Sequence, residues 1–427
     1  MDIKTLFFSF IILIFTSFSA HAQRTIIHAG TLIDGISDNP RSEVSIIVEG
    51  NEITGIQNGY INGRDGDEII DLKSKTVLPG LIDLHVHLES ETNAAKYLEP
   101  FTFNDADKAY RSVLFSKRTL MAGFTTVREL GGSGVNISLR DAIKGGYVVG
   151  PRIITVGKSL ATTGGHADPT NGWKEDLMGS PEPVDGVLNG VAEAREAVRQ
   201  RYKNGADHIK ITATGGVLSV AKSGDAPQFF MDELNAIVET ANEYGMHVAA
   251  HAHGAEGMKR AVEAGVLTIE HGTKMTPEVM DLMIEKGTYY VPTISAGKWV
   301  AEKAQIDGYY PELVVPKALE IGPMIQNTFA EAYKRGVNIA FGTDAGVFPH
   351  GLNGKEFQYM TEVGMPTMEA IKSATMTGAT VLGMQDQIGS IEAGKLADII
   401  ATDDNPLEDV TTLERVSFVM KDGVIYK

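Results

Sequence analysis

Short apolar runs along the chain each lead directly into a polar side chain of a kind found in metal and catalytic sites. The runs are LIDLHVH (81–87), HIKIT (208–212), VAAHAH (248–253), LTIEH (267–271) and IAFGTD (339–344). Apolar runs of this length, bounded by turn-forming residues, are typical of buried strands. Because side chains two apart on a strand point to the same face, His85 and His87 can bind one ion together.

Helical patterns alternate with these runs. Residues 191–204, 231–244 and 254–264 place apolar side chains at helical spacing, and Thr276 with Pro277 predicts a capped helix start. A glycine that can close a helix in the left-handed conformation precedes each following strand: Gly123, Gly205, Gly245, Gly265, Gly287 and Gly336. With a further strand in PRIITVG (151–157), the pattern predicts a (β/α)8 TIM barrel of the α/β class, with its site at one end.

The segments on either side of the barrel have a different character. Residues 23–78 and 388–427 contain short β-branched strands broken by turns such as Glu49-Gly50-Asn51 and Lys421-Asp422-Gly423. Two chain ends of similar character predict a composite β-sandwich, which leaves residues 79–387 for the barrel.

The composition and net charge limit the kinds of partner that the protein can bind. The 427 residues are 43% hydrophobic and carry a net charge of −17. An acidic surface repels polyanions, which disfavours nucleic acids and anionic membranes as partners. We therefore expect a small-molecule substrate, and we also expect a homo-oligomer.

The N-terminus predicts export. Residues 6–20 form an apolar stretch after Lys4, and Ala20-His21-Ala22 follows, which predicts a signal peptide over residues 1–22 with cleavage after Ala22. An uncleaved anchor is disfavoured because a spanning helix needs about 20 apolar residues. The sequence has no cysteine, which excludes disulfides and a lipoprotein anchor. We expect a secreted or periplasmic protein with no membrane contact after cleavage.

The polar residues at the strand ends form a set of nitrogen and oxygen ligands that suits Zn, with Mn, Co or Fe as alternatives. Lys210 stands out because an ammonium cannot bind a cation. Carboxylation of Lys210 by CO2 would give a carbamate that bridges two ions. We assign His85, His87 and Asp344 to one ion, and His251 and His271 to the other, with Lys210 and a hydroxide between them.

Several motifs of the mature chain resemble those of the amidohydrolase superfamily: VLPGLIDLHVHLES, TTVREL, TGGHAD, HIKITATGGVLS, VAAHAHG, IEHGT, FGTDAGVFPHG and GSIEAGKLADII. They are similar to the lysine-bridged binuclear branch that includes imidazolonepropionase-like proteins and Xaa-Pro dipeptidases. The resemblance implies that the bridging hydroxide is the nucleophile and that Asp344 is the proton shuttle. It also implies substrate or carbonyl-oxygen contacts at His166, His253 and His350, and we expect His166 to be catalytic together with Asp344. Arg128 is predicted either to bind a substrate carboxylate or to pair with Glu129 or another acid at the barrel end.

Three classes of function follow from this site. The first is a dipeptidase of the Xaa-Pro type or an N-acyl amino acid hydrolase. The second is a cyclic amide hydrolase, imidazolonepropionase-like, or an ester hydrolase. A non-catalytic scaffold is the third, and the intact ligand set argues against it. We interpret His28 and His208 as structural, because a lone histidine is more often structural than a ligand.

Overall fold

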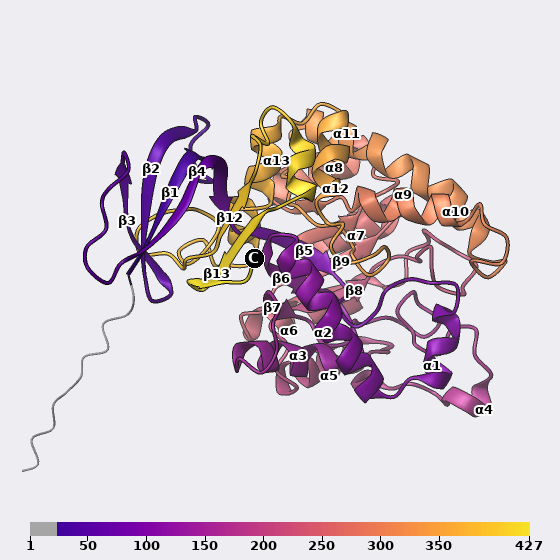
Figure 1. The fold of residues 1–427 in the computed structure, drawn as a ribbon. Helices are drawn as coiled ribbons and strands as arrows, with labels where there is room; N and C mark the ends of the chain where they lie inside the picture. The colour runs from indigo at the N-terminus through magenta and orange to yellow at the C-terminus, as the bar shows by residue number, and fades with distance from the viewer. Residues whose placement is uncertain (1–23) are drawn as a thin grey trace, which may run out of the picture.

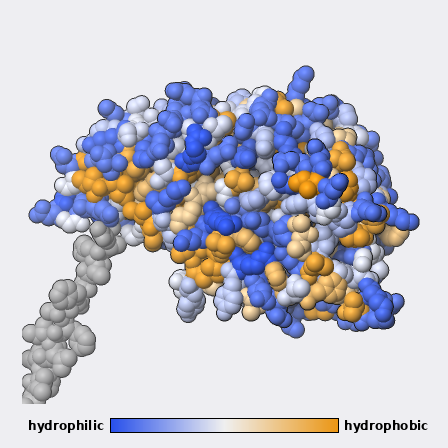
Figure 2. Space-filling model, turned by 45° about the vertical axis from the view of Figure 1, so that its right-hand side comes forward, coloured by the Kyte–Doolittle hydropathy of each residue, from blue (hydrophilic) through white to orange (hydrophobic). Residues whose placement is uncertain are grey.

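The computed structural model describes residues 24–427, so the predicted signal peptide over residues 1–22 lies outside the described residues. Figure 1 shows two parts, a sheet built from both chain ends and a larger part in which strands and helices mix. In the described part of the chain, no helix is long and apolar enough to span a membrane. On the face shown in Figure 2, hydrophilic residues predominate between smaller hydrophobic patches.

The two chain ends form one seven-stranded sheet in the order β14-β13-β12-β4-β1-β2-β3. Its strands are β1 (Arg24–Leu32), β2 (Arg41–Glu49), β3 (Glu52–Asn58), β4 (Glu68–Pro79), β12 (Ile399–Thr402), β13 (Phe418–Lys421) and β14 (Val424–Ile425). The ends meet where β4 pairs antiparallel with β12, with Leu78 opposite Ile400. The Ile53 N–H of the edge strand β3 also donates to the Lys395 carbonyl at 2.8 Å. We predicted a sandwich of two sheets, and the structure has a single sheet. Its edge strand β3 bonds back to the segment before β12, and the two halves of the sheet share an apolar core.

The predicted site residues lie on or beside parallel strands, and these strands form two sheets. One contains β5 (Leu81–Val86), β6 (Phe124–Glu129) and β7 (Arg152–Thr155), and the other contains β8 (Ile209–Thr212), β9 (Val248–Ala252), β10 (Thr268–His271) and β11 (Tyr289–Val291). Nearly all residues of these strands are buried, as expected for parallel strands with both faces covered.

The two parallel sheets are linked by single bridges. Beside β11, the Tyr290 N–H donates to the Asn338 carbonyl at 2.8 Å, and beside β5 the Asp344 N–H donates to the His85 carbonyl at 2.7 Å. At the other junction the Leu160 N–H donates to the Lys210 carbonyl at 2.8 Å. The segment 339–344, where we predicted an eighth strand, is not a regular strand. Asp344 has φ of +62°, which interrupts an extended ladder.

Helices cover the parallel strands (Figure 1). They are α1 (Glu99–Thr102), α2 (Asp105–Met121), α3 (Val135–Lys144), α4 (Glu175–Met178), α5 (Val191–Lys203), α6 (Met231–Glu243), α7 (Ala255–Ala264), α8 (Pro277–Lys286), α9 (Ile294–Lys303), α10 (Val315–Ile321), α11 (Ile325–Arg335), α12 (Lys355–Glu362), α13 (Thr367–Ser373) and α14 (Met376–Val381). Short 3-10 turns are η1 (Lys96–Leu98), η2 (Pro183–Asp185), η3 (Gly322–Met324) and η4 (Val410–Glu414).

The helix predictions are confirmed. The three periodic segments form α5, α6 and α7, and the Thr276 side chain accepts from the Val279 N–H at the start of α8. All six predicted glycine stops have positive φ, between 67° and 97°. These elements could be predicted because helical spacing and the left-handed conformation of glycine depend only on residues close in the chain.

Candidate metal centre

The predicted metal ligands come together in one cavity of about 340 Å³. They arrive from the carboxyl ends of β5, β8, β9 and β10 and from the segment before α12. The residues that line it include His85, His87, Lys210, His251, His271 and Asp344. The convergence that the strand ends predicted is therefore present in the structure.

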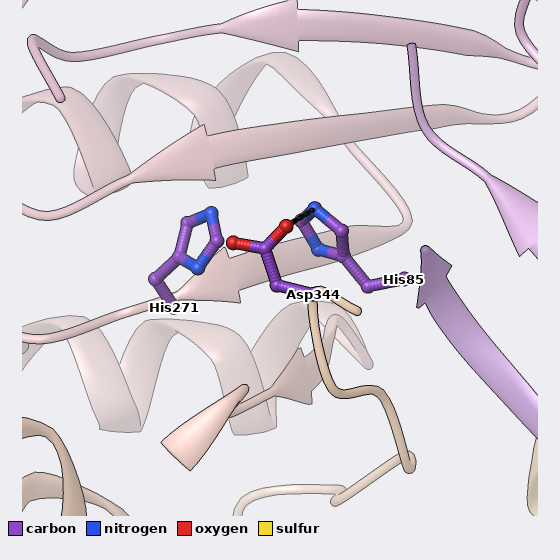
Figure 3. A group of neighbouring side chains, drawn as sticks. All are labelled: His85, His271 and Asp344. Carbon is purple, nitrogen blue, oxygen red and sulfur yellow. Dashed lines mark ion pairs between the residues drawn. The ribbon is translucent and has the colours of Figure 1, made fainter. Parts of the chain in front are cut away.

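Asp344 stands at the centre of this group. Its Oδ1 lies 3.3 Å from His87 Nε2 and 3.5 Å from His85 Nε2, and Lys210 Nζ lies 3.5 Å from the same His85 nitrogen. Ligand atoms of His85, His271 and Asp344 all lie within 4.8 Å of one another, and Figure 3 shows the carboxylate between the two rings. Asp344 Oδ1 is buried without a hydrogen-bond donor in the described residues. An orphaned carboxylate oxygen facing imidazole nitrogens is an arrangement that a cation would satisfy.

The second ring nitrogen orients three of these histidines. His87 Nδ1 lies 2.8 Å from the Gly131 carbonyl, and His271 Nδ1 lies 2.7 Å from Thr293 Oγ1. His85 Nδ1 lies 2.9 Å from Glu270 Oε2. A carbonyl or carboxylate only accepts, so Nδ1 carries the proton in His85 and His87, and Nε2 keeps its lone pair for a metal.

His251 is oriented by its other nitrogen. Its Nε2 donates to the Gly215 carbonyl at 3.1 Å, which leaves the lone pair on Nδ1. Its ring lies 4.6 Å from that of His271, between centroids, and stacks at 4.3 Å on His166. The second predicted pair of ligands is thus packed together.

Burial sets the protonation of the cavity. It lowers the pKa of His85, His251 and His271 well below the usual range and that of His87 to about 3, so these rings are neutral near pH 7. Burial also lowers the pKa of Lys210. Neutral imidazoles with an orphaned carboxylate fit a divalent transition metal. A neutral amine is the form that adds CO2, although carboxylation and the number of ions remain predictions.

Three residues of the site have strained backbones. His271, Thr293 and Asp344 have φ of 70°, 54° and 62°, a region that non-glycine residues seldom adopt. A regular strand would point the neighbouring side chains of Glu270 and His271 to opposite faces. In this structure Glu270 contacts His85 and His271 lines the cavity, so both serve the same site.

Glu270 is a site residue that the sequence analysis missed. It is fully buried, and its Oε1 accepts from Arg128 Nη2 at 2.8 Å while its other oxygen holds His85. Arg128 is 1% exposed, and its Nε donates to the Leu84 carbonyl at 2.7 Å. Arg128 does not line the cavity, which corrects the prediction that it binds a substrate carboxylate. The alternative, a pair with an acid of the barrel, is the arrangement found, and the partner is Glu270 rather than Glu129.

Of the other predicted substrate contacts, two lie on the cavity wall and one does not. His166 and His253 line the cavity, and His253 Nδ1 lies 2.9 Å from Thr273 Oγ1. His166 Nδ1 is buried with no partner in the described residues. His350 does not line the cavity. Its Nε2 donates to the Ser90 carbonyl at 3.0 Å and its ring stacks on Phe115, so its predicted substrate contact is not available in this structure.

Comparison with known proteins agrees with this geometry. The model of the amidohydrolase family matches residues 76–426. A crystal structure of a Xaa-Pro dipeptidase with methionine bound in the active site is 57% identical, with a TM-score of 0.93, over 95% of this chain and 100% of that one. A prolidase solved with N-methylphosphonate-L-proline is 31% identical, with a TM-score of 0.85, over 95% of this chain and 99% of the other. The ochratoxinase of Aspergillus niger is 32% identical over 95% of this chain and 87% of its own.

Proposed function

The chain belongs to the amidohydrolase family of hydrolases that act on carbon–nitrogen bonds, and on that premise we propose that it is a dipeptidase of the Xaa-Pro type. The observation that carries the proposal is the convergence of six predicted ligand side chains in one cavity. Its support is the 57% identity to a Xaa-Pro dipeptidase along nearly the whole chain. N-acyl amino acids share the same bond and carboxylate, and they belong to the same proposed substrate class.

The proposal includes two divalent metal ions, Zn first and Mn, Co or Fe as alternatives. One would be held by His85, His87 and Asp344 and the other by His251 and His271, with carboxylated Lys210 between them. When bound, such ions lower the pKa of water and polarise a substrate carbonyl. The neutral imidazoles and the orphaned Asp344 oxygen support this assignment.

Asp344 is proposed to move the proton. Its carboxylate would accept a proton from the attacking water and deliver it to the leaving nitrogen, which departs poorly as an anion. Burial raises the pKa of Asp344, which brings its proton affinity closer to that needed for transfer at neutral pH. His166 and His253 line the same cavity and are proposed to contact the substrate.

The proposal includes closure of the two parallel sheets into one barrel. A closed (β/α)8 barrel is supported by the hydrogen bonds of residues 338–344 to both β11 and β5, and by the bridge of Leu160 to β8. A barrel would place all six ligands at its carboxyl end, where such enzymes carry their sites.

A cyclic amide or ester hydrolase on the same site is the second candidate. The two are separated by a screen of Zn- or Mn-reconstituted enzyme against L-Xaa-L-Pro dipeptides, N-acyl amino acids, cyclic amides and simple esters. Turnover of Xaa-Pro dipeptides well above all other classes is expected, with loss on chelation. Selective turnover of a cyclic amide or an ester would replace the proposal. No turnover of any class with metal bound would favour a non-catalytic scaffold.

Export is proposed from the apolar stretch over residues 6–20 and the small residues around position 21. N-terminal sequencing of protein from the periplasm or medium is expected to begin at Gln23. A protein that retains Met1 and stays in the cytoplasm would contradict it.

A further inference from the structure

Lys96 is a cation on the wall of the cavity that the mechanism above does not use. Of the titratable residues that line the cavity, only Lys96 and Lys210 have side chains that are ordinarily cationic at neutral pH. Lys210 is already assigned to the metal centre by the proposed function. Lys96 is then the positive charge that remains on the wall.

The Lys96 ammonium is available to a ligand. In residues 24–427 its one hydrogen bond is to Ser90 Oγ at 3.3 Å, and Ser90 also lines the cavity. The carboxylates whose charge acts on Lys96 are those of Asp344 and Glu99. Asp344 is assigned to the metal centre, and Glu99 accepts from Arg111 at 3.0 Å and from Asn93 at 3.1 Å. No ion pair joins Lys96 to a carboxylate of the described chain, and a half-buried ammonium without a counter-ion favours an anionic ligand.

Other basic side chains near the site are already engaged. Arg128 is buried against Glu270. Lys317 donates to the carbonyls of Gly216, Ser219 and Ala221 at 2.7 to 3.0 Å and holds the loop that they form. Neither lines the cavity, so neither can meet a ligand there.

The turn that carries Lys96 is anchored. The neighbouring Tyr97 hydroxyl donates to the Leu218 carbonyl at 2.9 Å, and Leu218 is part of the cavity wall. Much of the remaining wall is apolar and includes Val217, Leu218, Val300, Ile321, Ile325 and Val347. A cavity with one free ammonium and a largely apolar wall fits a ligand with one anionic group and an apolar remainder.

We propose that Lys96, assisted by Ser90, binds the free carboxylate of the amino acid released by hydrolysis. This inference rests on the proposed function and deepens it. It makes the enzyme an exopeptidase that requires a free C-terminal carboxylate, and it assigns to Lys96 the role that the sequence suggested for Arg128.

The test compares L-Leu-L-Pro with its C-terminal amide, which has the same scissile bond and no carboxylate charge. Wild type is expected to favour the acid in kcat/KM by about 10- to 100-fold, the scale of a charge-assisted hydrogen bond. Lys96→Met should lose that factor on the acid and change less than about threefold on the amide, and Lys96→Arg should recover part of it. Lys108→Met is the matched control, since Lys108 lies on α2 and pairs with Asp105 at 3.1 Å, outside the cavity wall. An equal loss on acid and amide, or no loss on either, would overturn the proposal.

A binding measurement separates this inference from the proposed function. Calorimetry of Zn-loaded wild type and Lys96→Met would compare L-proline with L-prolinamide, and a preference for L-proline that disappears in the variant is expected. If dipeptides are not cleaved but this preference is found, the proposed function fails and the carboxylate site stands. If dipeptides are cleaved and both proteins bind the two probes equally, the function stands and the role of Lys96 is refuted.

Discussion

Replacing Glu270 by glutamine should weaken both the fold and the metal centre. The buried carboxylate accepts from three donors, on His85, Arg128 and Thr268. Glutamine has a single acceptor oxygen, and its amide would face one of these donors with another N–H. The change therefore removes the counter-charge of Arg128 and disturbs the group that fixes the His85 tautomer.

The magnitude follows from the geometry of the pair. Two unit charges 2.8 Å apart attract by about 6 kcal/mol at an effective dielectric constant of about 20. Desolvation offsets part of this attraction, and removal of one partner from a buried pair costs about 3–5 kcal/mol. We expect Glu270→Gln to lower the free energy of unfolding by that amount, and to weaken metal binding by about 10- to 100-fold through His85.

Equilibrium unfolding in urea, with metal removed by a chelator, measures the loss in the free energy of unfolding. A metal competition titration measures the loss in metal affinity. Asp281→Asn is the matched control, because Asp281 pairs with Arg335 at 2.6 Å with side chains 59% and 41% exposed. An exposed pair of this kind contributes little to stability, because solvent screens its charges. If the metal-free Glu270→Gln protein is no less stable than this control, the buried pair does not stabilise the fold.

Three further predictions concern the metal centre. Active enzyme should contain two divalent ions per chain by elemental analysis and lose activity on chelation, and a ratio near one with full activity would contradict the two-ion assignment. Lys210→Ala should lose metal and turnover together, and a short-chain carboxylic acid plus metal should restore part of both. A guanidinium neither adds CO2 nor binds a cation, so an active Lys210→Arg would exclude carboxylation. Asp344→Asn should reduce dipeptide turnover by about 10²-fold or more at matched metal content and affect an activated ester less, because that leaving group needs no proton; an unchanged dipeptide rate would show that Asp344 moves no proton.

Local patterns in the sequence determined much of this protein. The helices α5, α6 and α7 and the six glycine stops were predictable, because helical spacing and left-handed glycine depend on residues close in the chain. The cavity ligands could be named because each lies in or directly after a short apolar run, and parallel strands bring their carboxyl ends to one side. These are properties of short segments.

Only the tertiary structure decided which polar groups meet. The Glu270–Arg128 pair joins residues 142 positions apart, and no local pattern distinguishes an arginine that faces a substrate from one that faces a buried acid. The positive φ at His271 and Asp344 is held by contacts with other strands, so strand alternation could not show that Glu270 and His271 serve the same site. Lys96 lies in a turn without periodicity, and tertiary contacts such as the Tyr97 hydrogen bond to the Leu218 carbonyl accompany its place on the cavity wall. Pairing and burial depend on what the rest of the chain places around a residue, and that information is not local.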